Sequence, residues 1–185
     1  SEVTDAKYRA IIDEGIALGV REVFFKGGGE PLLRRDLVKF AATRFARAGV
    51  SGLLITNGTL LDERLASLLA DNAWSEVAIS LDSADAEVHD RIRQKAGTFG
   101  LAVLAARRLA AARARLGAAY PRIKFHAVLT KLNAGGIGAL IALAADSGAD
   151  AVELDSLDAF EPSAAGLRLS EQDADAFAAG LEGWL

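Results

Sequence analysis

The sequence contains no cysteine and no methionine. Without thiols, the chain has no disulfide, no thiolate nucleophile and no thiolate metal site of its own. Because even an initiator methionine is missing, we expect that Ser1 is not where the natural polypeptide begins.

Long apolar runs are absent as well. No stretch of about 18 uninterrupted apolar residues occurs, so the sequence predicts no transmembrane helix. The first residues show neither a signal-peptide pattern nor a lipidation signal. We therefore expect a soluble protein without a membrane partner, and the cytoplasm is its default location.

A strong positive charge is also lacking. The formal net charge is -4 over 185 residues, which argues against nucleic acid as a partner. One local basic cluster consists of Arg107, Arg108, Arg113 and Arg115, and we interpret it as a solvated helix face. The hydrophobic content of 51% is sufficient for the core of one domain.

Two kinds of segment alternate along the chain. Short apolar runs predict five strands, over 22–26, 52–56, 76–82, 122–130 and 151–155. Segments with apolar residues at helical spacing predict helices near 4–19, 36–49, 62–69, 98–116, 137–148 and 171–181. The order is therefore a helix, followed five times by a strand and a helix.

Strands that are apolar on both faces and alternate with helices predict an α/β fold with a parallel sheet. Right-handed crossovers produce either a closed or partial barrel or an open doubly wound sheet, and the hydrophobic pattern alone does not choose between them. The first helix has no strand before it. We expect the missing strand to lie upstream of Ser1 or to be absent from this chain.

Polar residues gather where the predicted strands end, and parallel α/β folds bind ligands at this edge. These strand ends carry Gly27–Glu30, Thr56–Gly58, Ser80–Ser83, then Thr130, Lys131 and Asn133, and finally Glu153 and Asp155. Some of these residues have simpler interpretations. Thr56–Gly58 is typical of a turn, and Asp82 could equally be the N-cap of the next helix.

The segment Gly27–Pro31 contains three glycines followed by a glutamate and a proline. A phosphate loop is disfavoured, because no Gly-Lys-Ser/Thr follows and Glu30 would repel a phosphate. Glycines instead allow the backbone to approach a bound molecule, and their carbonyl oxygens together with the Glu30 carboxylate suit a cation such as an ammonium group. Pro31 stiffens the end of the loop.

Four segments in this order resemble the radical S-adenosylmethionine (SAM) enzymes. They are "GGEPLLRRDL" at 28–37, "ITNGTLL" at 55–61, "VAISLDSADAEVHDRIR" at 77–93 and "GTF" at 97–99. The resemblance covers Ser1 to about Asp158. It implies a partial (β/α)6 TIM-like barrel whose first strand is missing from this chain. Residues 1–158 would form the barrel core, and residues 159–185 a linker and a C-terminal helix, after which a further domain could follow.

The resemblance also implies two cofactors, SAM and a [4Fe-4S] cluster, and reductive cleavage of SAM to a 5'-deoxyadenosyl radical that modifies a substrate. The residues expected to bind SAM are Gly28, Gly29, Glu30, Asn57, Ser80, Asp82, Arg93 and Asn133. By analogy with the family, the first three would receive the amino group, and Ser80 and Asp82 the ribose. Arg93 would receive the carboxylate and Asn133 would lie near the adenine, with Asn57 as a further polar neighbour.

This chain departs from the family in one respect: the cysteines that hold the cluster are missing. Family members typically space them Cys-x3-Cys-x2-Cys before the first helix, so we expect the cluster ligands upstream of Ser1 and none within the chain. The 185 residues alone are then expected to be inactive. The resemblance further implies a small-molecule or peptide substrate and an electron donor such as flavodoxin or ferredoxin.

Two alternatives remain open at this point. One is a divalent-metal-dependent barrel of aldolase or isomerase type, with Glu30, Asp82, Glu153 and Asp155 as oxygen ligands. It needs no cysteine, but it leaves the three glycines without a role. The other alternative is a non-catalytic module that binds SAM.

Overall fold

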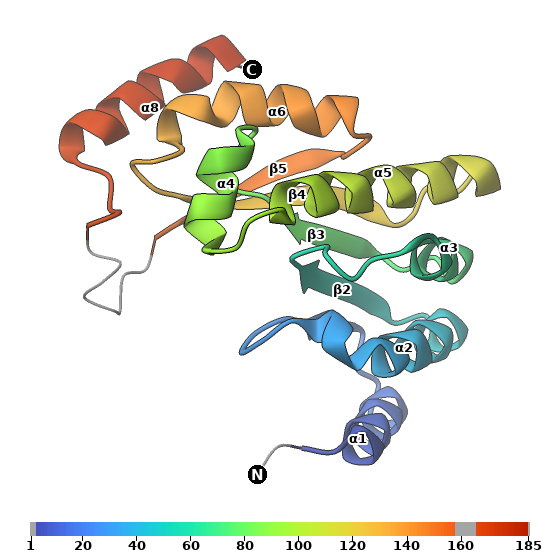
Figure 1. Cartoon of the computed structure of the whole chain (residues 1–185). Helices are drawn as coiled ribbons and strands as arrows, with labels where there is room; N and C mark the ends of the chain where they lie inside the picture. Colours follow the sequence, from blue (N-terminus) through green and yellow to red (C-terminus); the bar gives the residue numbers. More distant parts are fainter. Residues whose placement is uncertain (1–2, 158–165, 185) are drawn as a thin grey trace.

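The computed structural model describes residues 3–157 and 166–184. Its centre is a five-stranded parallel sheet in which the strands follow one another in chain order (Figure 1). The strands are β1 (Glu22–Phe25), β2 (Ser51–Thr56), β3 (Glu76–Ser80), β4 (Arg122–Leu129) and β5 (Ala151–Ser156). The predicted α/β class and the parallel pairing are confirmed.

A helix precedes β1, and at least one helix follows each strand. The α-helices are α1 (Asp5–Ala17), α2 (Arg35–Ala48), α3 (Glu63–Asp71), α4 (Ala86–Arg93), α5 (Thr98–Leu116), α6 (Ile137–Asp146) and α8 (Glu171–Trp184). Two 3-10 helices, η1 (Pro31–Arg34) and η2 (Ala134–Gly136), lie where β1 and β4 lead into their helices.

The chain order of the strands distinguishes the two parallel architectures. An open doubly wound sheet reverses its order at a switch point, whereas a barrel adds each strand beside the previous one. Here the order runs from β1 to β5 without reversal, so the sheet is a partial barrel. The prediction of a partial TIM-like barrel is confirmed.

Helices cover one face of this sheet. Leu54, Ile123 and Phe125 point to that face and are completely buried. At the β1 side, Phe25, Phe45 and Trp74 pack as an aromatic group with ring centroids 5.8–6.3 Å apart. The core therefore lies between the sheet and its helices.

We call the other face of the sheet the open face. Successive side chains on a strand alternate between faces, and paired residues on neighbouring strands share a face. The register pairs Ser80 with His126 and His126 with Glu153. The open face consequently carries Leu53, Ile55, Ala78, Ser80, Lys124, His126, Ala151, Glu153 and Asp155.

Side chains fix where the helices begin. The N-cap of α4 is Asp85, whose Oδ1 accepts hydrogen bonds from the backbone N–H groups of Glu87 and Val88. Asp82 is therefore not a helix cap, and that interpretation was wrong. It failed because the chain first turns through 83–85 before α4 begins, and no hydrophobic pattern marks that turn.

The last helix, α8, packs against α6 and η2. Most of the predicted linker lies outside the described residues, so the boundary at residue 158 stays a prediction. In the part of the chain that the structure describes, none of the helices combines the length and apolar character needed to cross a membrane.

Candidate functional site

A cavity of about 250 Å³ lies at the carboxyl ends of β1, β2 and β3. It is lined by Gly27, Gly29, Glu30, Pro31, Ile55, Thr56, Asn57, Ser80 and Arg93. Five of the eight predicted SAM-binding residues are among them, namely Gly29, Glu30, Asn57, Ser80 and Arg93. These come from segments far apart in the sequence, and the parallel sheet brings their strand ends to one edge.

The glycine loop after β1 forms one wall of this cavity. Gly27 has a φ of +111°, which non-glycine residues rarely adopt. A Cβ atom built on Gly27, Gly28 or Gly29 would meet no protein atom within 4 Å. Packing inside the protein thus gives no reason for the second and third glycines, and the open space beside them suits a ligand that approaches the backbone.

Glu30 follows the glycines and is held in place by three donors. Its Oε1 accepts hydrogen bonds from Leu32 N at 2.9 Å and Thr56 Oγ1 at 2.6 Å, and its Oε2 accepts one from Asn57 N at 2.8 Å. Since a carboxylate oxygen can accept about two hydrogen bonds, Oε2 keeps one position for a further donor. The carboxylate is therefore fixed and still able to bind a cation.

Arg93 provides the opposite charge in the same cavity. Its Nε and Nη2 donate to Oδ2 and Oδ1 of Asp82 at 2.6 and 3.0 Å. The Arg93 side chain is 30% exposed, while that of Asp82 is 1% exposed. Both Asp82 oxygens face inward, and Oδ1 also accepts from Val128 N at 3.1 Å. Asp82 thus holds Arg93 at the cavity wall from behind.

His89 supports Asp82 from α4. Its Nδ1 accepts a hydrogen bond from Asp82 N at 3.2 Å. Burial lowers the pKa of His89 below its ordinary value of 6.5, although the Asp82 carboxylate acts in the opposite direction. We conclude that His89 is neutral, because a protonated Nδ1 could not accept this hydrogen bond.

The remaining predicted residues lie at or behind the cavity. Gly28 lines a larger neighbouring cavity of about 470 Å³ between α1 and the glycine loop. Asn133 is 2% exposed, and its Nδ2 donates to the backbone oxygens of Asp82 and Val128 at 2.7 and 2.9 Å. Its Oδ1 accepts from Thr130, so Asn133 ties the ends of β3 and β4 together.

Asn57 has two roles at once. Its Oδ1 accepts from Thr59 N and Thr59 Oγ1, which forms the turn that the Thr-Asn-Gly segment predicts. Its backbone N–H binds Glu30, and the residue lines the cavity. The sequence interpretation placed Thr56 at a strand end but gave it no role, and in the structure its hydroxyl group orients Glu30. A threonine that ends a buried strand was the available signal.

The four carboxylates of the divalent-metal alternative do not come together. Glu30 and Asp82 are bound by the partners described above, whereas Glu153 and Asp155 lie on β5. Among the described residues, the ligand atoms that do lie close together belong to His126, Glu153 and Asp155. The structure therefore does not assemble the proposed four-carboxylate site.

The charges of the cavity are those that the amino acid end of SAM would need. A free amino acid group carries an ammonium and a carboxylate, and the cavity offers Glu30 for the first and Arg93 for the second. A [4Fe-4S] cluster is different: its usual ligands are thiolates, and this chain has none. The residues present do not fit the cluster.

A partial parallel barrel with a charged cavity at its strand ends defines a class of ligand-binding α/β barrels. The comparison with family models is more specific. The model of the radical SAM superfamily matches residues 1–129. The chain belongs to the radical SAM superfamily.

Several curated proteins are similar in sequence. The mycofactocin maturase MftC of Mycolicibacterium smegmatis is 35% identical over 153 residues, which cover 80% of this chain and 36% of that protein. The Fe-coproporphyrin III synthase of Methanosarcina barkeri is 36% identical over 104 residues, covering 56% of this chain and 25% of that protein. A PqqA peptide cyclase of Methylocella silvestris is 32% identical over 154 residues, which cover 83% of this chain and 39% of that protein.

Solved structures show the same fold. SuiB of Streptococcus suis gives a TM-score of 0.75 at 13% identity and covers all of this chain and 41% of its own. The enzyme anSMEcpe with bound AdoMet gives a TM-score of 0.74 at 20% identity, and the match covers 98% of this chain and 51% of that one. At these identities the likeness concerns the fold alone. This chain spans 25% to 39% of the length of the curated relatives just described.

Proposed function

We propose that this chain is the SAM-binding core of a radical SAM enzyme that reductively cleaves SAM and modifies a peptide. The observation that carries the proposal is the pairing of Glu30 and Arg93, two fixed opposite charges that line one cavity beside the glycine loop. Family membership supports the same conclusion.

The residues of the cavity divide the binding task. Glu30 Oε2 and the carbonyl oxygens of the glycine loop accept hydrogen bonds from the SAM ammonium group, and Gly28 and Gly29 keep side chains out of its way. Arg93 donates to the SAM carboxylate. The guanidinium atom Nη1 has no hydrogen-bond partner among the described residues, so it remains free for this contact.

Other predicted residues act at the ribose or through their neighbours. Ser80, 8% exposed at the cavity wall, contacts the ribose. Asp82 positions Arg93, and Asn133 holds the β3 and β4 ends that carry Asp82 and Val128. When bound, SAM supplies the 5'-deoxyadenosyl radical that the family uses to take hydrogen from a substrate.

A peptide is the proposed substrate class. One relative is named a PqqA peptide cyclase, and anSMEcpe has been solved with AdoMet and the Kp18Cys peptide. The Fe-coproporphyrin III synthase is named for a product that is not a peptide, so support comes from the peptide-modifying relatives alone. We further propose an electron donor such as flavodoxin or ferredoxin, and cluster ligands upstream of Ser1.

Isothermal titration of the 185-residue chain with SAM tests the binding site. We expect weak, saturable binding that Glu30→Ala and Arg93→Ala each reduce by about tenfold or more, because each removes a charge-assisted hydrogen bond. Arg91→Ala is the matched control, since Arg91 is an exposed residue of the same helix. Binding that does not depend on Glu30 and Arg93 would contradict the site.

Activity requires a separate experiment. The protein with its upstream segment, supplied anaerobically with iron, sulfide and a reductant, should convert SAM to 5'-deoxyadenosine. If a protein with a full iron–sulfur cluster binds SAM but forms no 5'-deoxyadenosine, the chain is a non-catalytic SAM-binding module and the enzymatic proposal fails.

A further inference from the structure

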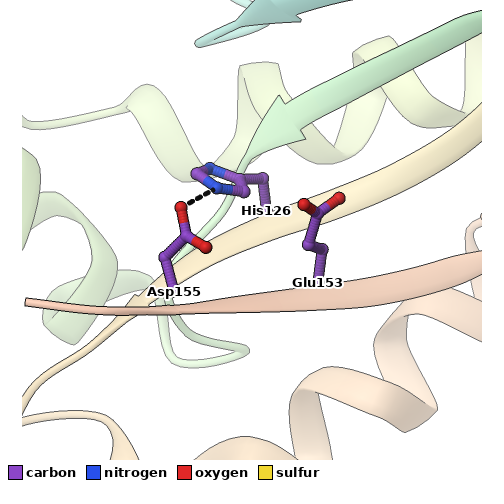
Figure 2. Close-up of side chains that lie close together, drawn as sticks. All are labelled: His126, Glu153 and Asp155. Atoms are coloured by element: carbon purple, nitrogen blue, oxygen red, sulfur yellow. Dashed lines mark hydrogen bonds and ion pairs between the residues drawn. The ribbon is translucent and has the colours of Figure 1, made fainter.

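Three side chains of types that bind metals meet on the open face, next to Ser80 at the edge of the Glu30 and Arg93 cavity. They are His126 on β4 and Glu153 and Asp155 on β5, and their ligand atoms all lie within 4.8 Å of one another. Figure 2 shows the three side chains on the same side of the two strands, with the His126 ring beside Asp155.

The sheet register explains this convergence. Glu153 and Asp155 are two residues apart on β5, so both point to the same face. The register places His126 opposite Glu153 and Val128 opposite Asp155. His126 Nε2 lies 2.8 Å from Asp155 Oδ2, which fixes the ring toward the two carboxylates. The cluster is therefore built on rigid strands and not on a loop.

The donor set suits a divalent transition metal. One imidazole nitrogen and two carboxylate oxygens are ligands that Zn²⁺ accepts, at about 2.0–2.2 Å each. Ligands of a tetrahedral Zn²⁺ are then about 3.3 Å apart, so Nε2 and Oδ2 need to separate by only about 0.5 Å. The exposed Glu153 and Asp155 side chains have room for this movement.

The surrounding charges favour a cation. Near the cluster, Lys124 Nζ lies 2.9 Å from Glu76 Oε2 and 3.3 Å from Glu153 Oε2. Lys124 thus pairs with two carboxylates, those of Glu76 and Glu153, and Asp155 adds a third beside His126. A divalent ion would balance the excess negative charge, and the second oxygen of Glu153 remains available to it.

The geometry points to a Zn²⁺-type divalent metal site formed by His126, Glu153 and Asp155. Three protein ligands leave a fourth position, and this position faces the open face on which Ser80 neighbours His126. An oxygen ligand of a molecule that lies over the sheet can take it. The site is defined without SAM, so it stands or falls independently of the proposed function.

The composition of the chain makes the test specific. It has no cysteine and only two histidines, and the other histidine, His89, is 1% exposed and bound to Asp82. Titration of the 185-residue chain with Zn²⁺ or Co²⁺ alone should show one-to-one binding. In NMR spectra, the His126 ring signals should shift while those of His89 stay unchanged.

Variants identify the ligands. Zn²⁺ binding should weaken by about tenfold or more in each of three variants, His126→Gln, Glu153→Gln and Asp155→Asn. Removing a residue that only supports a metal ligand already costs about tenfold in affinity, so removing a ligand should cost at least as much. Glu22→Gln is the matched control, because Glu22 is an exposed carboxylate that lies on β1 and also points to the open face. Circular dichroism confirms that each variant folds. No binding at millimolar Zn²⁺, or binding equal in His126→Gln and Glu22→Gln, would overturn the proposal.

Discussion

Glu30 and Arg93 each combine a charge with a rigid support. Glu30 is held by Leu32, Thr56 and Asn57, and Arg93 by the Asp82 carboxylate. Groups that are fixed before the ligand arrives lose little conformational freedom on binding, which favours affinity. The supporting residues therefore matter to the site, both Thr56 and Asn57, which line the cavity, and Asp82, which lies behind it.

Asp82 allows this support to be measured. Replacing Asp82 by alanine leaves Arg93 without its partner and Val128 N–H without an acceptor. Breaking a buried pair costs about 3–5 kcal/mol, and the partial exposure of Arg93 reduces this to about 2–4 kcal/mol. Urea unfolding should show this loss, whereas Asp175→Ala, on the exposed surface of α8, should stay within about 0.5 kcal/mol of the original chain. Equal stability of the two variants would contradict this role.

His89 should make stability depend on pH. Burial lowers its pKa in the folded state, so the unfolded chain binds a proton more readily. The stabilising contribution is then complete above the ordinary pKa of 6.5 and is lost as pH falls below it, down to the folded-state pKa. Thermal unfolding between about pH 7.5 and 5 should show a slope that His89→Gln reduces. An unchanged slope in this variant would refute the assignment.

At the scale of elements, β2 packs tightly against the loop after α3. A Cβ atom on Gly52 would lie 2.7 Å from Trp74 Cη2, and that ring is 2% exposed between Phe25 and Phe45. Gly52→Ala should therefore cost about 1–3 kcal/mol through overpacking. Gly100→Ala in α5 meets nothing within 4 Å and should instead stabilise the protein by about 0.5–1 kcal/mol. Denaturant midpoints that shift in the same direction would contradict this packing.

Elements were also the level at which the sequence was most informative. All five strands were predicted within one or two residues, because each is an apolar run flanked by turn residues. Among the helices, the exception was α4, which the hydrophobic pattern did not predict. Its short, largely polar sequence carries a weak hydrophobic pattern, and its N-cap Asp85 could not be told from the nearby Asp82.

For the whole molecule, SAM should act as a stabilising ligand. At ten times its Kd, a ligand that binds only the folded state adds about 1.4 kcal/mol, which corresponds to about 3–6 °C in Tm for a chain of this size. Differential scanning fluorimetry should show this shift. Methylthioadenosine, which lacks the amino acid group, should give a smaller shift, because it cannot contact Glu30 and Arg93. Equal shifts for both molecules would argue against recognition of the amino acid end.

The sequence by itself determined the parallel α/β class, the strand positions and the motif segments, because these depend on local hydrophobic patterns and short-range spacing. Only the tertiary structure decided which side chains work together. Asp82 meets Arg93 11 residues away and Asn133 51 residues away, and His126 meets Asp155 29 residues away. Such contacts depend on strand register and on which face each residue takes. A hydrophobic pattern does not contain these distances, so the support behind Arg93 and the His126 cluster appeared only once the sheet was assembled.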